Sequence, residues 1–246
     1  MGAQASVTIV TGGARGIGAA TVLALAARGH VVVFSYLEAE DAAKSVVAAV
    51  EKGGGRARAL RADVVQEEGI RRIFATADEE GKVVGLVNNA GTNGGMGQFV
   101  DMPDAQVRRV FDVNVLGAMQ ACREAVSRFV AHGAGGGIVN VTSQAATFGG
   151  NGIAAYAASK AALQTFTIAL AREVAGSRIR VNAVRPGVIG TDMHRSAPAE
   201  RRAQVASTLP LGRPGEPEEV AATISWLLLD APEYLTGAIV PVSGAR

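Results

Sequence analysis

Short apolar runs alternate with longer amphipathic stretches along the whole chain, and this alternation constrains the fold more than any other feature. The apolar runs contain few polar positions, so both faces of each predicted strand contact protein rather than water. The stretches between them carry apolar residues at the spacing of an amphipathic helix. We therefore predict strands at residues 6–11, 31–36, 57–62, 83–88, 137–142, 179–184 and 238–242. Helices are predicted at residues 14–28, 38–52, 66–80, 103–130, 153–175 and 217–229.

Strands that are buried on both faces and separated by helices are typical of a parallel sheet with helices on both sides. Right-handed connections then give a doubly wound α/β fold, the Rossmann type of domain. No linker or change of composition divides the 246 residues, so we predict a single domain, residues 1–246. The polar, proline-containing stretch at residues 191–216 fits no core element. We expect it to cover the substrate, and the alternative is an ordinary surface loop.

Charge and composition exclude several classes of protein. The chain has 24 basic and 22 acidic residues, which is too balanced for binding nucleic acid by phosphate neutralisation. The single cysteine, Cys122, permits no intramolecular disulfide or Cys-based zinc site and is expected to be inert packing, and three scattered histidines lack metal-ligand spacing. No uncharged apolar run reaches the ~18 residues of a membrane span, and the first residues do not form a secretion signal. We predict a cytoplasmic protein with no metal, no nucleic-acid partner and no membrane partner.

Three glycines follow the first predicted strand and open the first predicted helix. Gly12, Gly16 and Gly18 have the spacing G-x-x-x-G-x-G. Glycine permits a tight turn and a close approach of the backbone to a pyrophosphate, and a helix N-terminus offers unpaired N–H groups and positive partial charge. Glycines alone are weak evidence, but their place between the first strand and the first helix predicts a dinucleotide-binding loop.

The residues around the second strand favour NADP(H) over NAD(H). An NAD site usually places an acidic residue at the end of this strand to bind the ribose 2′-hydroxyl, and here no acidic residue precedes Glu38. Arg15 lies in the glycine loop, where a guanidinium can reach a 2′-phosphate, and Ser35 can donate a hydrogen bond to that phosphate. The alternatives are that Arg15 only solvates the loop and that the cofactor is NAD.

Polar residues also follow the third and fourth strands, at the edge where open α/β sheets bind ligands. Asp63 can accept a hydrogen bond from an adenine amino group, cap the following helix, or do both. Asn88 and Asn89 can satisfy backbone groups of a loop near the ribose, or form an Asx turn.

Tyr156 and Lys160 lie four residues apart on a predicted helix and therefore share a face. Lys160 stands among small and apolar residues, where an ammonium group would lower the pKa of a neighbouring phenol and make it a usable general acid or base. Ser143 ends the fifth strand and could hydrogen-bond a substrate oxygen, while Asn114 is a polar residue inside a helical stretch. Taken singly, each of these residues also has a purely structural interpretation.

Together these motifs resemble those of the short-chain dehydrogenases/reductases. The resemblance rests on TGGARGIG at residues 11–18, NNAG at residues 88–91, Asn114, Ser143, YAASK at residues 156–160, and Pro186-Gly187. It covers nearly the whole chain, and the length is similar to that of the compact members of about 250 residues. Within the family the chain is similar to the 3-oxoacyl-carrier-protein reductase and glucose-1-dehydrogenase types.

The resemblance implies hydride transfer between NADP(H) and a carbonyl or alcohol substrate, such as a ketone, a 3-oxoacyl group or a sugar. Tyr156 would be the general acid or base, Lys160 would lower its pKa and hold the nicotinamide ribose, and Ser143 would orient the substrate oxygen. Asn114 would hold a water that links Lys160 to solvent. The implied cofactor-binding residues are Gly12, Arg15, Gly16, Ile17, Gly18, Ser35, Asp63, Val64, Asn89, Ala90, Gly91, Tyr156, Lys160, Pro186, Gly187 and Thr191.

Two other functions stay open from the sequence. One is an NAD-dependent sugar or polyol dehydrogenase, and the other is a non-catalytic NADP-binding regulator. The resemblance also implies a homotetramer, and the apolar helix around residues 154–170 is compatible with a subunit interface. His194, inside the 191–216 segment, is either a substrate contact or an ordinary loop histidine.

Overall fold

The computed structural model describes residues 4–191, 200 and 207–245, and within them seven strands form one sheet. The order is β3-β2-β1-β4-β5-β6-β7, and every neighbouring pair is parallel. The strand order changes direction between β1 and β4, as in a doubly wound sheet, so the predicted fold class is confirmed. The strands are β1 (Ser6–Val10), β2 (Val31–Tyr36), β3 (Arg56–Arg61), β4 (Lys82–Asn88), β5 (Gly136–Val141), β6 (Ile179–Pro186) and β7 (Ile239–Val242).

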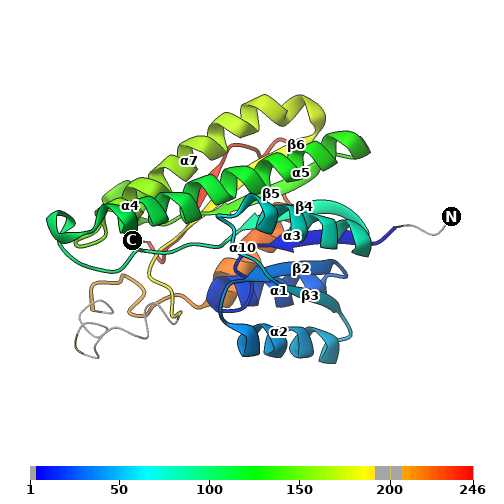
Figure 1. The fold of residues 1–246 in the computed structure, drawn as a ribbon. Helices are drawn as coiled ribbons and strands as arrows, with labels where there is room; N and C mark the ends of the chain where they lie inside the picture. The colour runs from blue at the N-terminus through cyan, green and yellow to red at the C-terminus, as the bar shows by residue number, and fades with distance from the viewer. Residues whose placement is uncertain (1–3, 192–199, 201–206, 246) are drawn as a thin grey trace.

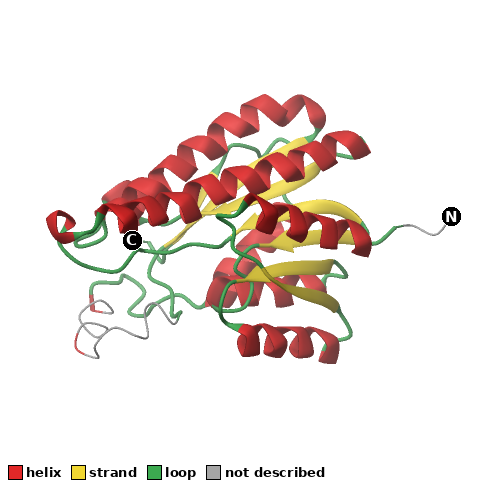
Figure 2. Ribbon diagram, in the orientation of Figure 1, coloured by secondary structure: helices red, strands yellow, loops and turns green. Residues whose placement is uncertain are grey.

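Helices cover both faces of the sheet (Figures 1 and 2). One face packs against α3 (Glu67–Glu80), α5 (Ala118–His132) and α7 (Ala154–Val174). The other face packs against α1 (Gly16–Ala27), α2 (Glu40–Lys52) and α10 (Pro217–Leu229). Two separate apolar cores result, one on each side of the strands.

The two cores explain why the strands that are covered on both sides are mostly apolar, whereas the edge strand β3 carries Arg56, Arg58 and Arg61. In β2, Val31 and Val33 face the core under α3, whereas Val32 and Phe34 face the core under α1 and α2. Successive side chains of a strand point to opposite faces, so a strand covered on both sides needs apolar residues at every position. The same alternation places Val7 and Val10 of β1 in different cores.

The long helix predicted at residues 103–130 is divided in the structure. It consists of α4 (Asp104–Phe111), a π-helical segment η2 (Asp112–Gly117), and α5. The apolar spacing predicted the helix but could not locate the π segment, because one extra residue in a turn hardly changes the pattern. A Cβ atom at Gly117 would lie 2.8 Å from the carbonyl oxygen of Val64, so a glycine allows this segment to lie against the end of β3.

Elsewhere the predicted helices and strands are found with ends shifted by at most two residues. Within residues 4–191 and 207–245, three short helices were not predicted: η1 (Phe99–Asp101), α6 (Ala145–Phe148) and η3 (Ala175–Ser177). Each is too short to carry a readable apolar period. Within the described residues, no helix is long and apolar enough to cross a bilayer.

A buried polar network joins the middle of the sheet to the helices above it. The Nδ2 atom of Asn88 donates to Asn140 Oδ1 at 2.9 Å and to Cys122 Sγ at 3.2 Å, and Asn140 Nδ2 donates to Thr167 Oγ1 at 2.9 Å. Asn88 therefore belongs to the core, and its predicted place near the ribose is wrong. Burial raises the pKa of the Cys122 thiol to about 12, against a weaker opposite effect of the Asn88 hydrogen bond, which agrees with inert packing.

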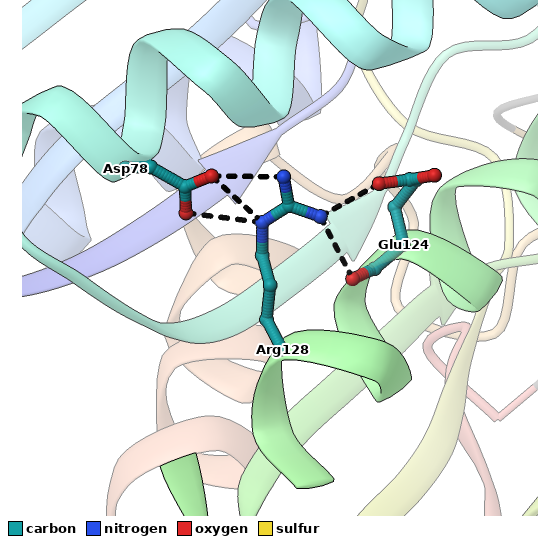
Figure 3. Close-up of polar contacts among 3 residues, drawn as sticks. All are labelled: Asp78, Glu124 and Arg128. Atoms are coloured by element: carbon teal, nitrogen blue, oxygen red, sulfur yellow. Dashed lines mark hydrogen bonds and ion pairs between the residues drawn. The ribbon is translucent and has the colours of Figure 1, made fainter. Parts of the chain in front are cut away.

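Arg128 of α5 links this helix to α3 (Figure 3). Its Nε and Nη2 atoms donate to the Asp78 carboxylate of α3, with Nη2 to Oδ2 at 2.8 Å. Its Nη1 donates to Glu124 Oε2 at 2.6 Å, one turn earlier on α5. The guanidinium carbon also lies 4.8 Å from the ring centre of Phe74. One partly buried cation thus neutralises two carboxylates and covers an aromatic ring of the core.

We expect Arg128→Met to lower the free energy of unfolding by about 1–2 kcal/mol at low ionic strength, because two charge-assisted contacts are lost at a partly screened site. Urea denaturation at low salt and at about 1 M NaCl measures the effect, and the loss should shrink in salt. Arg172→Met is the control, since Arg172 is exposed on α7 and has no ion-pair partner among the described residues. Equal losses in the two variants would contradict the assigned role.

Candidate functional site

In the glycine loop between β1 and α1, backbone segments lie closer together than a residue with a side chain would allow. Gly12 has φ +66° and Gly16 has φ +53°, both in the left-handed region. A Cβ at Gly18 would lie 2.2 Å from the Gly12 carbonyl oxygen. The loop leads into the N-terminus of α1, whose N-cap residue Arg15 is extended and exposed. A backbone without side chains at a helix N-terminus fits a dinucleotide pyrophosphate.

Ser35 supports this loop from beneath and does not face a ligand. Its side chain is 1% exposed, and its Oγ accepts a hydrogen bond from the Gly12 N–H at 3.2 Å. The Ser35 carbonyl accepts a second bond from the Gly13 N–H at 2.9 Å. The prediction that Ser35 donates directly to a 2′-phosphate is therefore wrong, because the hydroxyl lies under the loop.

The loop after β4 is tied to the glycine loop. Asn89 Nδ2 donates to the carbonyl oxygens of Thr11 at 3.0 Å and Gly12 at 2.9 Å. In return, Thr11 Oγ1 accepts the backbone N–H groups of Asn89 and Ala90, both at 3.0 Å. Asn89 thus satisfies loop backbone groups, as predicted. Thr11 was not predicted as a site residue, because its partners lie far away in the sequence.

Asp63 and Val64 follow β3 on the other side of the glycine loop. Asp63 Oδ1 accepts the Val65 N–H at 3.0 Å, and Asp63 Oδ2 lies 3.1 Å from Arg109 Nη2 of α4. The first contact is an Asx turn rather than a helix cap, since α3 begins only at Glu67. Arg109 was missed from the sequence. The predicted contact of Asp63 with adenine stays a prediction.

Ser143 and Tyr156 meet at the end of β5. The side chains are hydrogen-bonded, and Ser143 Oγ also accepts the Ala145 N–H at 3.1 Å, which fixes the serine at the start of α6. Burial raises the pKa of the Tyr156 phenol, and the Ser143 hydrogen bond opposes this only in part. The phenol is therefore protonated at neutral pH.

Lys160 lies one turn after Tyr156 on α7 and is 3% exposed. Its Nζ donates to the Val141 carbonyl oxygen of β5 at 2.8 Å and lies 5.8 Å from the centre of the Tyr156 ring. Burial lowers the pKa of Lys160 to about 8. The prediction that this ammonium lowers the tyrosine pKa is wrong for this structure, because burial raises the pKa of the phenol and lowers that of the amine, and the amine donates to a main-chain carbonyl.

Asn114 connects the π segment η2 to the catalytic turn of α7. Its Oδ1 accepts the Thr92 N–H at 2.8 Å, and its Nδ2 donates to the Thr92 carbonyl oxygen and to Ser159 Oγ, both at 2.9 Å. Ser159 Oγ in turn donates to the Tyr156 carbonyl oxygen at 2.7 Å. The side chain of Asn114 thus positions a loop and a helix turn, and its predicted contact with a water stays a prediction. Ser159 was not identified from the sequence.

The remaining predicted residues surround the same edge of the sheet. A Cβ at Gly91 would lie 3.3 Å from both Lys160 Nζ and Asn114 Oδ1, so the β4 loop reaches the lysine. A Cβ at Gly16 would lie 3.0 Å from Thr191 Cγ2, which places the end of the β6 loop against the glycine loop. Pro186 is the last residue of β6, and Gly187 follows it and donates its N–H to the Val242 carbonyl oxygen of β7. Ile17 is the second residue of α1.

Two predictions cannot be placed. His194 and most of the 191–216 segment, namely residues 192–199 and 201–206, lie outside the described residues. The described ranges, 4–191, 200 and 207–245, contain no group of three or more His, Cys, Asp or Glu side chains that could hold a metal ion.

Comparisons with known proteins give consistent matches over the whole chain. The family model described as enoyl-(acyl carrier protein) reductase matches residues 12–244. An uncharacterized oxidoreductase of Escherichia coli, YgfF, is 41% identical over 246 residues, which cover 98% of this chain and 100% of YgfF. A 3-oxoacyl-[acyl-carrier-protein] reductase of Synechocystis is 41% identical over 243 residues, covering 98% of this chain and 96% of the reductase. The crystal structure of the acetoin dehydrogenase YohF from Salmonella typhimurium superposes with a TM-score of 0.89 at 33% identity, covering 98% of this chain and 95% of YohF.

The lowered pKa of Lys160 predicts a specific pH dependence of stability. The folded-state pKa of about 8 lies below the ordinary value of 10.5, so between these values the unfolded chain binds more protons than the folded protein. Stability therefore rises with pH in this window, and below it the cost of burying the charge is fully present. The free energy of unfolding of wild type and of Lys160→Met is measured by urea denaturation at several pH values. The difference, wild type minus variant, should increase by about 1–2 kcal/mol between about pH 7 and about pH 9.5. Parallel pH curves for the two proteins would contradict the assignment.

Proposed function

The chain belongs to the short-chain dehydrogenase/reductase family of NAD(P)-dependent oxidoreductases, and we propose that it transfers a hydride between NADP(H) and a carbonyl or alcohol substrate. The observation that carries the proposal is the cluster of Ser143, Tyr156 and Lys160 beside the glycine loop. The site thus combines a proton donor, Tyr156, with Ser143, which can orient a substrate oxygen. Both lie at the same end of the strands as the glycine loop that would bind the dinucleotide.

The residues of the glycine loop and its neighbours bind the cofactor. The Gly12 and Gly13 N–H groups are bonded to Ser35, so the N–H groups at the N-terminus of α1, which begins at Gly16, face the pyrophosphate. The contact of Thr191 with Gly16 supports a place for this hydroxyl near the same phosphates. Lys160 holds the nicotinamide ribose. When it is bound, the nicotinamide supplies or accepts the hydride.

The side chains of the site handle the proton. Ser143 Oγ donates a hydrogen bond to the substrate oxygen and polarises the carbonyl. The phenol of Tyr156 then gives its proton to that oxygen as negative charge develops on it. The raised pKa of Tyr156 supports this role, because the phenol carries its proton at neutral pH and can donate it. The bond from Lys160 to the Val141 carbonyl holds the amine 5.8 Å from the centre of the Tyr156 ring.

NADP(H) is the preferred cofactor in this proposal. Arg15 is exposed at the start of α1, and the end of β2 carries no acidic residue before Glu38. The substrate is a ketone, as the names of the similar 3-oxoacyl reductase and acetoin dehydrogenase suggest.

The assembly is a homotetramer in this proposal, with α7 in a subunit interface. From its start to Ala169, α7 exposes the uncharged residues Ala154, Ala158, Thr165, Ile168 and Ala169, and its exposed charged residues, Arg172 and Glu173, lie in the last turn. Exposed helix faces made of small uncharged residues are typical of helix packing between subunits.

Tyr156→Phe should lower kcat for carbonyl reduction by at least about 10²-fold while NADPH still binds, because the change removes proton transfer and leaves the cofactor loop intact. Steady-state NADPH oxidation and fluorescence titration measure the two effects. Tyr234→Phe is the matched control, since Tyr234 is fully exposed after α10. Retained turnover in Tyr156→Phe would refute the mechanism, and wild-type NADPH binding without oxidation by any ketone, aldehyde, sugar or acyl thioester would favour a non-catalytic regulator.

Ile168→Glu should shift the protein from tetramers to smaller species, because a buried unpaired carboxylate opposes a subunit contact. Light scattering coupled to size-exclusion chromatography measures the mass. Val130→Glu on the exposed end of α5 tests whether the effect is specific to α7. A wild-type monomer would refute the proposed assembly.

A further inference from the structure

The carboxyl ends of β2 and β3 bring an arginine to the place where a dinucleotide's adenosine ribose binds. Arg61 ends β3 and pairs in register with Tyr36, the last residue of β2. Its Nε donates to the carbonyl oxygen of Leu37 at 3.1 Å. In doubly wound folds the residues about 20 positions after the glycine motif, at the end of the second strand, contact the ribose 2′ position. The guanidinium of Arg61 is therefore fixed beside that position.

Arg61 differs from the other two arginines of β3 because it forms no ion pair among the described residues. Arg56 is paired with Glu80, and Arg58 lies 2.8 Å from Glu79. Among the described residues no carboxylate forms an ion pair with Arg61, whose only hydrogen bond is the one from Nε. Both terminal amino groups of this exposed side chain are thus available for an anion.

The acidic residues near Arg61, Glu38 and Glu40, form no ion pair with it among the described residues. Glu40 at the start of α2 lies 2.8 Å from Lys44. The pKa of Glu40 is lowered mainly by the hydrogen bond and charge of Lys44, and the charge of Arg61 contributes least. Glu38 is exposed and forms no ion pair with Arg61. Ser35, the other polar side chain of this segment, is buried under the glycine loop.

We infer that Arg61 is a specificity-determining residue that binds the 2′-phosphate of NADP(H) through its terminal amino groups. This inference rests on the proposed function and deepens it, because it assigns the cofactor choice to a residue of β3. A planar guanidinium pairs well with phosphate oxygens, and the bond from Nε to Leu37 holds its plane in advance of binding. NADH carries a hydroxyl at the same position and gives no charge for Arg61 to pair with.

The test compares Arg61→Ala and Arg61→Gln with Arg58→Ala. Arg58→Ala removes the same charge from the same strand, but its guanidinium is bound to Glu79 and Glu80. Dissociation constants for NADPH and NADH are measured by fluorescence titration, and 2′,5′-ADP and 5′-ADP are used as competitors. We expect both Arg61 variants to bind NADPH and 2′,5′-ADP about tenfold or more weakly. Binding of NADH and 5′-ADP should change less than about twofold, and Arg58→Ala should resemble wild type.

The possible failures are distinguishable. If wild type binds NADH more tightly than NADPH, the proposed cofactor preference fails and the inference fails with it. If wild type prefers NADPH and the Arg61 variants keep that preference, only the inference is overturned, and Arg15→Ala then shows whether the glycine loop holds the phosphate. If the Arg61 variants bind both cofactors equally more weakly, Arg61 only supports the end of β2, which also overturns the inference.

Discussion

When helices cover both faces of a parallel sheet, polar and catalytic side chains can meet a ligand only beyond the carboxyl ends of its strands. Both faces here are filled by apolar cores, so the sheet offers no other surface to a ligand. The bonds between Asn89 and the backbone of Thr11 and Gly12 draw the loops after β1 and β4 together at the point where the strand order reverses. The glycine cradle, the β5 serine and the α7 tyrosine all depend on this meeting of strand ends.

Burial controls the electrostatics of the site more strongly than neighbouring charge. Tyr156 and Lys160 both lose water, and in each the neutral form is favoured: the phenol keeps its proton and the amine gives its proton up more readily. The amine is held by a main-chain carbonyl, so its position does not depend on the charge of the phenol. Tyr156 and Lys160 therefore do not act as an ion pair. The protonated phenol of Tyr156 is a proton donor already in place, which suits the transfer of a proton to a developing alkoxide.

The sequence predicted the order of strands and helices because the apolar pattern of a doubly covered sheet is local. It also predicted Tyr156, Lys160, Ser143 and Asn114 as site residues from motifs in the sequence, and their roles in the reaction stay predictions. It missed Thr11, Ser159 and Arg109 because their partners lie 78, 45 and 46 residues away. Ser35 was assigned to the wrong partner, since sequence gives its position but not the direction of its hydroxyl. The tyrosine pKa was predicted in the wrong direction because the spacing to Lys160 is visible in the sequence and the depth of burial is not.

The π segment η2 has a consequence for how this helix can change over evolution. A π turn holds one residue more than an α turn, so the two flanking helices keep their rotational phase while Asn114 is displaced toward Thr92 and Ser159. A single-residue deletion here would restore a regular helix without rotating α5 out of its core, yet it would turn the amide away from both partners. Length variation at residues 112–117 is therefore tolerable for folding but not for the geometry of the site.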